Sequence, residues 1–358
     1  MWFAILGGAT VAGGVWLRAQ WDKPGPLAQV KAVMVPRGGT AAAAGALKSA
    51  GVIESATAFE ALSWLTIFDG SIRAAEFSFP PKATIGQVLT ILRTAKPVEH
   101  RITIIEGLTA RQIAALAAAA EAASGPVEVP AEGAVLPQTY AFDRGMARDA
   151  ILGRAKAAMD KELATAWAAR APNLPLTSAR DLLIVASIVE RETARDQERP
   201  HVAAVYLNRL RLGMKLQADP TVAYGASGGS GVLDHKLSRA DLERDDPYNT
   251  YRRGGLPPGP ICSPGVASLR AVSRPMTSDD LYFVADGTGG HAFAKTVEAH
   301  NRNVARWRGL QAPEPASQPN PPANPPANPP ANPPANPPAN PVANPVANPV
   351  VIPPGTAR

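Results

Sequence analysis

Two glutamates at the end of a long apolar run are the residues of this sequence best placed to do chemistry. Residues 182–189 read LLIVASIV, interrupted only by Ser187, and Glu190, Arg191 and Glu192 follow directly. This run predicts a buried helix, and a carboxylate at its end is costly unless it is paired or used. A partly buried Glu has a raised pKa and can act as a general acid near neutral pH. The alternative is that the helix simply emerges into solvent here.

The two glutamates cannot share one face of a helix. Positions two apart point roughly 200° away from each other, so at most one of Glu190 and Glu192 serves a given site. Thr177 is the expected N-cap of this helix. The residues alone leave open which glutamate is used.

Loops after this helix are rich in side chains that bind sugars. Aromatic rings stack on pyranose faces, and amides and hydroxyls bind sugar hydroxyl and N-acetyl groups. The plainer interpretations are a helix cap for Asp219, a loop tie for Asn208 and a core position for Tyr224. A catalytic role for His291, which follows a Gly-Gly turn, is a weaker hypothesis than a structural one. The substrate-binding candidates are Asn208, Gln217, Asp219, Tyr224, Tyr248, Asn249, Thr250 and Tyr251.

Composition excludes several other classes of protein. The net charge of +6 is too small and too dispersed for a nucleic-acid-binding protein, although it suits a polyanionic partner or an anionic membrane surface. A single cysteine, Cys262, cannot form an internal disulfide. The sequence has no Cys/His cluster at metal-ligand spacing, no Gly-rich phosphate loop and no serine elbow. We therefore expect neither a metal nor a cofactor.

The two ends of the chain differ in composition from its body. Residues 1–17 carry no charged side chain and reach the short limit for a membrane-spanning helix, so residues 1–20 are predicted to be a membrane anchor. The first positive side chains, Arg18 and Lys23, follow this segment, and the positive-inside rule alone places the body in the cytoplasm. After Gln311 an Asn-Pro-Pro-Ala repeat predicts an extended, disordered tail over 312–358.

The body of the chain reads as an α+β protein. Residues 24–129 alternate short strands and helices, and their first strand, helix, helix, strand order matches a small carbohydrate-binding LysM-like module. A Pro- and Gly-rich connector at 124–140 predicts a domain boundary, followed by a mainly helical domain with short strands over 130–311. The expected strands are 30–36, 73–79, 101–106 and 281–285, and the expected helices include 56–65, 85–92, 110–123 and 203–212.

Seven blocks of this sequence, in matching order and spacing, resemble the endolytic murein transglycosylases of the YceG-like family. The resemblance is clear over about 130–308 and looser over 24–129, where that family carries a LysM-like subdomain. The blocks are 186–193 (ASIVERET), 205–214 (VYLNRLRLGM), 216–224 (LQADPTVAY), 236–242 (KLSRADL), 247–259 (PYNTYRRGGLPPG), 263–268 (SPGVAS) and 281–293 (LYFVADGTGGHAF).

The resemblance implies cleavage of the β-1,4 bonds between N-acetylmuramic acid and N-acetylglucosamine within peptidoglycan strands. The product ends in 1,6-anhydro-N-acetylmuramic acid, because the sugar's own C6 hydroxyl is the nucleophile and one Glu serves as acid and then base. The resemblance assigns that role to Glu192, with Glu190 as the alternative. It also implies a single-pass inner-membrane protein with a periplasmic body, which outweighs the positive-inside argument.

The family resemblance further suggests that the protein sets strand length during synthesis, with peptidoglycan synthases as hypothetical partners. Two other functions stay open. A noncatalytic wall-binding scaffold would need no intact glutamate, and a hydrolase would use Asp219 as a second carboxylate and leave a reducing end.

Overall fold

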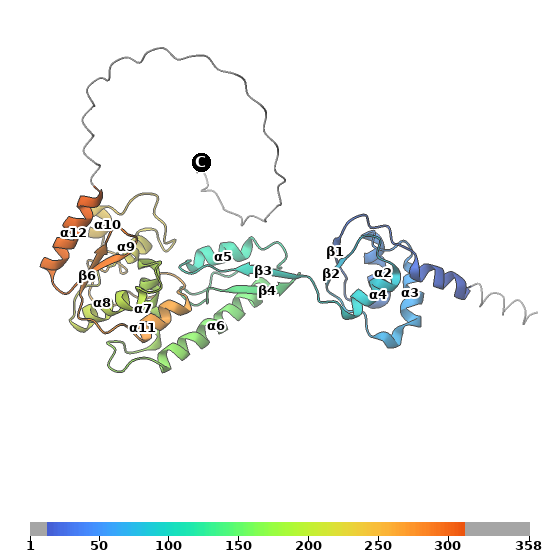
Figure 1. The fold of residues 1–358 in the computed structure, drawn as a ribbon, viewed down its shortest axis with the longest axis horizontal. Coiled ribbons are helices and arrows are strands. Elements are labelled where there is room, and N and C mark those ends of the chain that lie inside the picture. Colours follow the sequence, from blue (N-terminus) through green and yellow to red (C-terminus); the bar gives the residue numbers. More distant parts are fainter. Residues whose placement is uncertain (1–12, 312–358) are drawn as a thin grey trace, which may run out of the picture. The chain divides into compact units, whose positions relative to one another are not determined.

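A computed structural model describes residues 13–311 of the chain (Figure 1). The Pro-rich tail and most of the predicted membrane anchor fall on residues 1–12 and 312–358, outside this range. Residues 13–22 are helical. Within the described range, no helix combines the length and the apolar character needed to cross a bilayer. The anchor therefore stays a prediction.

The first part of the chain folds around an antiparallel pair of short strands. Strand β1 (Lys31–Met34) pairs with β2 (Glu76–Phe79), and helices α2 (Gly39–Ser49), α3 (Ala56–Leu65) and α4 (Ile85–Thr94) pack with them. The α4 helix begins at a capping box in which Thr84 and Gln87 bond each other's backbone amides. The strand, helix, helix, strand order predicted from the sequence is confirmed, with shorter strands, and the LysM-like assignment remains a prediction. Buried residues of this core include Leu47, Phe59, Phe77, Phe79 and Leu89.

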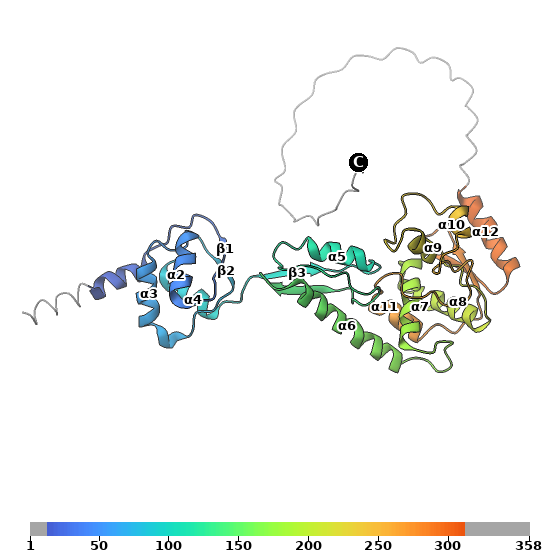
Figure 2. The same ribbon diagram turned by 180° about the vertical axis from the view of Figure 1, so that it is seen from behind.

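A second antiparallel ribbon follows and spans the connector at which the sequence predicts a domain boundary. Strand β3 (Glu99–Thr103) pairs with β4 (Thr139–Asp143), and α5 (Ala110–Ala118) and α6 (Arg148–Ala168) run along this ribbon (Figure 2). One hydrophobic cluster includes residues from both strands and both helices. The connector at 124–140 thus lies within a packed unit, because β4, which the sequence analysis missed, returns to pair with β3.

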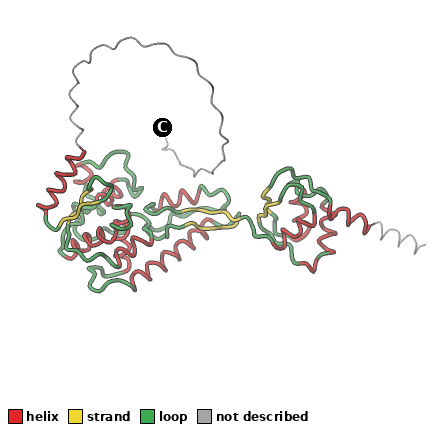
Figure 3. The backbone as a smooth tube through the Cα atoms, in the orientation of Figure 1, coloured by secondary structure: helices red, strands yellow, loops and turns green. Residues whose placement is uncertain are grey.

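The remaining helices surround α7 (Ala179–Glu192). Its residues from Leu182 to Val189 are all buried, as the apolar run predicts. It contacts α6, α8 (Arg199–Arg211), α9 (Asp219–Ala226) and α11 (Val266–Ser273). A hairpin of β5 (Tyr282–Ala285) and β6 (His291–Ala294) packs on α12 (Val297–Gln311). Long loops join these elements (Figure 3), and α10 (Arg239–Glu243) is a single short turn of helix among them.

The start of α7 differs by one residue from the prediction. Ser178, and not Thr177, is the N-cap, because Asp181 stands three residues later and completes a capping box with it. Thr177 adds to the same cap, since its hydroxyl donates to Asp181 Oδ2 at 2.6 Å. Inside α7, the Ser187 hydroxyl donates to the Ile184 carbonyl and accepts from the Ile261 amide at 3.1 Å, so this buried polar group is satisfied.

Candidate active site

Glu192, the last residue of α7, points into a cleft of about 290 Å³. Helix α7 places Glu192 there because the apolar part of the helix is buried and its C-terminal turn lies at the wall of the cleft. Helices α8, α9 and α12 and the β5–β6 hairpin supply the other walls. The lining residues are Glu192, Tyr206, Arg209, Leu216, Gln217, Asp219, Tyr251, Phe283, Val284, Ala285, His291 and Trp307.

The carboxyl group of Glu192 is poised to titrate near neutral pH. Burial raises its pKa from 4.5 to about 7, and the negative charge of Asp219 raises it too, while the Tyr206 hydrogen bond and the Arg209 charge lower it. The Tyr206 hydroxyl donates to Glu192 Oε1 at 2.5 Å. A carboxyl group with a pKa raised toward neutral pH can both give and take a proton there.

Glu190 faces away from the cleft, as the spacing of two residues requires. Arg199 donates to its Oε1 at 3.1 Å, and the Gly265 amide donates to its Oε2 at 2.8 Å. The side chains of Glu190 and Arg199 are only 4% and 6% exposed. Both carboxylate oxygens are thus occupied, and they join the end of α7 to α8 and to the start of α11.

Arg209 holds one wall of the cleft through backbone carbonyls. It donates to the Leu281 carbonyl at 2.6 Å and to the Leu216 carbonyl at 2.7 Å. Its guanidinium also lies over the Tyr282 ring, 5.2 Å from the centroid. These contacts fix a positive charge beside the two carboxylates of the cleft.

Asp219 and Tyr251 form a hydrogen-bonded pair on the α9 side of the cleft. The Tyr251 hydroxyl donates to Asp219 Oδ1 at 2.6 Å. Asp219 is therefore not the predicted helix cap: Ala218 is the N-cap residue of α9, and it provides no side-chain bond. Gln217 precedes it with a left-handed backbone (φ 50°), which a non-Gly residue adopts at some cost.

Three of the eight predicted substrate-binding residues, Gln217, Asp219 and Tyr251, thus line the cleft with Glu192. Asn208 instead donates to the Ser278 and Asp280 carbonyls.

The remaining four candidates also lie outside the lining of this cleft. Asn249 is buried and donates to three carbonyls between Asp241 and Arg244. The Thr250 hydroxyl accepts from the Ala218 amide at 2.9 Å. Tyr224 donates to Glu132 Oε2 at 3.0 Å, and its ring lies 4.8 Å from that of Tyr248.

The cleft also contains residues that the sequence analysis did not select. Tyr206 and Arg209 stand three apart on α8, and this spacing would have placed them on one helix face. Trp307 and Phe283 carried no such signal, because only the packing of α12 and β5 brings them to the cleft. In the described part of the chain, no group of three His, Cys, Asp or Glu residues could hold a metal ion. Cys262 is buried and unpaired with another cysteine.

A buried, titratable carboxyl group in a polar and aromatic cleft defines an acid–base site. The model of the YceG-like family matches residues 33–306, so the chain belongs to that family. Proteins named endolytic murein transglycosylase from Streptococcus pneumoniae (strains D39 and R6) are 36% identical to it over 181 residues, which cover 49% of this chain and 32% of theirs. The protein of that name from Bacillus subtilis is 36% identical over 177 residues, 49% of this chain and 48% of its own.

The match thus spans about a third to a half of the length of these relatives. A solved structure of a yceG-like protein from Listeria monocytogenes is 27% identical, with a TM-score of 0.49, over 76% of this chain and 98% of that one.

Proposed function

We propose that this protein is an endolytic lytic transglycosylase of peptidoglycan, with Glu192 as its acid and base. One observation carries the proposal: the cleft is lined by a partly buried carboxyl group, that of Glu192, which accepts from Tyr206 and whose pKa is raised to about 7. Membership of the YceG-like family and the name endolytic murein transglycosylase carried by its relatives support the substrate class.

In the proposed reaction, Glu192 protonates the glycosidic oxygen that leaves C1 of N-acetylmuramic acid. The C6 hydroxyl of the same sugar then attacks C1, and the Glu192 carboxylate takes its proton. No water enters, so the new end is a 1,6-anhydro sugar. Because the attack is intramolecular, proximity supplies a large part of the rate.

The lining of the cleft suits a glycan strand. Tyr251, Phe283 and Trp307 offer ring faces on which pyranoses stack. Gln217 offers an amide for hydroxyl or N-acetyl groups, and Arg209 offers a positive charge for anionic groups of the strand.

Asp219 makes a hydrolase the second candidate, since it places another carboxylate in the same cleft. The Tyr251 hydroxyl already occupies one of its oxygens, which argues against its use as the base for a water molecule. The noncatalytic scaffold is the remaining alternative, and the titratable Glu192 argues against it.

The test is a product assay with the full chain and uncrosslinked glycan strands, with fragment masses read by mass spectrometry. We expect internal fragments with anhydro ends from the wild type and from Glu190→Gln after correction for folded protein, and none from Glu192→Gln. Loss in Glu190→Gln alone would move the acid to Glu190. Products one water heavier would indicate a hydrolase, and no cleavage by folded wild type would indicate the scaffold.

The proposal extends to a single-pass inner-membrane anchor, a periplasmic body and a role in ending strand elongation beside peptidoglycan synthases. Its support is the family resemblance and the uncharged segment 1–17. Recovery of the full chain in the soluble fraction would count against the anchor. Co-purification that recovers no synthase would count against the partners.

A further inference from the structure

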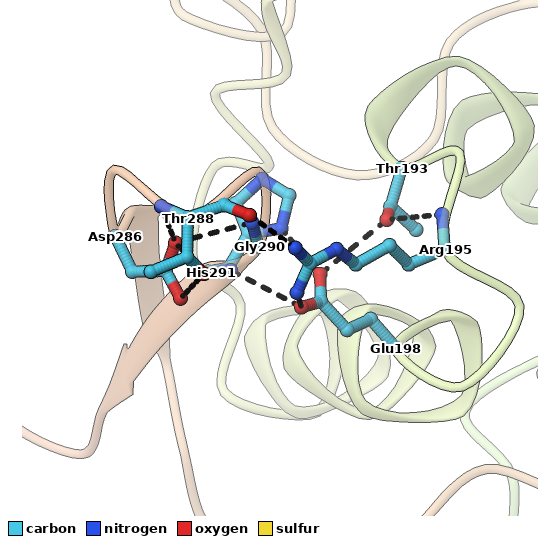
Figure 4. Close-up of polar contacts among 7 residues, drawn as sticks. All are labelled: Thr193, Arg195, Glu198, Asp286, Thr288, Gly290 and His291. Atoms are coloured by element: carbon cyan, nitrogen blue, oxygen red, sulfur yellow. Dashed lines mark hydrogen bonds and ion pairs between the residues drawn. The ribbon is translucent and has the colours of Figure 1, made fainter.

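A second acid–base group lines the cleft from the β5–β6 hairpin. His291, the first residue of β6, lines the same cleft as Glu192. Its Nδ1 lies 2.7 Å from Glu198 Oε2, and its backbone amide donates to Glu198 Oε1 at 3.2 Å (Figure 4). Glu198 therefore holds both the ring and the backbone of His291 and fixes the direction of the imidazole.

This contact also fixes the tautomer of the neutral ring. A carboxylate only accepts hydrogen bonds, so Nδ1 carries the hydrogen and Nε2 keeps its lone pair. Glu198 further stabilises the charged ring if Nε2 takes a proton, as a carboxylate behind a histidine does in other acid–base sites.

The surroundings hold this histidine–glutamate pair in place. Thr193 donates to Glu198 Oε2 at 3.4 Å, and Arg195 lies 3.7 Å from Oε1 and also donates to the Thr288 carbonyl. Asp286 closes the β5–β6 turn by accepting from the amides of Thr288 at 2.7 Å and Gly290 at 3.1 Å (Figure 4). The turn that carries His291 is thus tied to the loop between α7 and α8.

We propose that His291, held by Glu198, is a second catalytic residue that takes the proton of the sugar's C6 hydroxyl. This proposal rests on the proposed function and changes one step of it: His291, in place of the Glu192 carboxylate, takes the proton of the C6 hydroxyl. The C1–O bond breaks as Glu192 gives its proton to the leaving oxygen. The C6 oxygen then bonds to C1 and its proton passes to His291 Nε2. Proton transfer from the imidazolium to the Glu192 carboxylate through cleft water restores both groups.

A separate base has a chemical purpose at this point. Once Glu192 has given up its proton, its carboxylate accepts from Tyr206 and faces the hydroxyl of the leaving strand. If the C6 hydroxyl is not activated, water competes with it for C1. The fraction of hydrated ends therefore reports on the base that serves the C6 hydroxyl.

The test compares His291→Gln with a matched histidine variant, His201→Gln. His201 is equally exposed, at 17%, and also pairs with a carboxylate, Asp280, at 2.8 Å, but it does not line the cleft. With uncrosslinked glycan strands, we expect His291→Gln to form anhydro ends about 10²-fold more slowly. We also expect products one water heavier. His201→Gln should give only anhydro ends, at the wild-type rate.

Glu198→Gln provides a second variant if His291→Gln does not fold. Its amide oxygen can still accept from the ring, but the negative charge behind the imidazolium is gone, so hydrated ends should appear in a smaller fraction. Wild-type rate and products in a folded His291→Gln, or in Glu198→Gln where His291→Gln does not fold, would overturn the proposal. Absence of anhydro ends from the wild type would instead overturn the proposed function.

Discussion

Two neighbours of Glu192 push its pKa in opposite directions, which gives a paired prediction. The Tyr206 hydrogen bond lowers the pKa of Glu192, and the Asp219 charge raises it. Because the protonated form is the proposed acid, the rate should fall as pH rises through about 7. Tyr206→Phe should move this fall to higher pH, and Asp219→Asn should move it to lower pH, as measured by the rate of anhydro-end formation across pH.

Each of these two variants is the control for the other. A general loss of packing would lower the rate in both without moving the alkaline fall in opposite directions. Shifts of the same sign, or none, would mean that another group controls this limb of the pH profile.

The buried carboxyl of Glu192 should also cost stability in alkaline solution. Its pKa rises from 4.5 to about 7 on folding, so the folded state binds the proton more tightly. The penalty is absent below pH 4.5, grows as pH rises to 7 and is complete above it, at about 3 kcal/mol. Glu192→Gln should therefore unfold at higher urea than the wild type at pH 8 and at a similar concentration at pH 4.5.

Glu243→Gln provides a control for the removal of one acidic side chain, because Glu243 is exposed and pairs with Arg239 on the same short helix. Its urea midpoint should track that of the wild type at both pH values. A lower midpoint for Glu192→Gln at pH 8 would mean that the Glu192 carboxylate stabilises the fold, against the expected sign.

At the scale of elements, Glu190 joins the end of α7 to its neighbours. Without Glu190, the Gly265 amide loses its partner and Arg199 keeps only the more exposed Asp196 and Glu106, and losses of this kind typically cost about 3 kcal/mol. Glu190→Ala should lower the free energy of unfolding by about this amount, measured by urea denaturation. Its activity per folded molecule should remain, whereas Glu192→Gln should stay folded and inactive. The opposite pattern would reverse the assignment of the two glutamates.

The sequence predicts those elements whose signals are local. The apolar run 182–189 predicts α7, and the helix expected at 85–92 agrees with α4. Strand β4 pairs with β3, 36 to 44 residues earlier in the chain, so this pairing depends on a long-range contact. Local patterns could not have placed it.

The same distinction holds for the candidate site. Glu192 could be selected because desolvation follows from its position after an apolar helix. Asn249 and Thr250 look equally suited to bind a sugar, yet loop carbonyls and the Ala218 amide use their polar atoms. Residue type shows what a side chain can bind, and only the folded loop shows which partner it has.

At the scale of the whole molecule, Glu132 links two hydrophobic clusters. Its Oε1 accepts from the Ala110 amide at 2.9 Å, at the start of α5, whose Ile113 lies in one cluster. Its Oε2 accepts from Tyr224, which packs against the other cluster around α7. Burial raises the pKa of Glu132, and its hydrogen bonds to Ala110 and Tyr224 oppose this rise. This side chain is therefore one of the links between the β3–β4 ribbon and the helices, beside the backbone hydrogen bonds of Ser263 with Gly107 and Leu108.

Glu132→Ala should lower the free energy of unfolding by about 3 kcal/mol, since it leaves an amide and a hydroxyl without partners. A double-mutant cycle with Tyr224→Phe should give a coupling energy of about 1 kcal/mol. In calorimetry, Glu132→Ala should broaden or split the thermal unfolding transition.

The exposed hydrogen bond between Thr103 and Thr139, 2.9 Å long and confined to the ribbon, is the comparison pair. A cycle there should give a few tenths of a kcal/mol at most and leave the transition unchanged. Equal coupling energies in the two cycles would show that Glu132 does not connect the clusters.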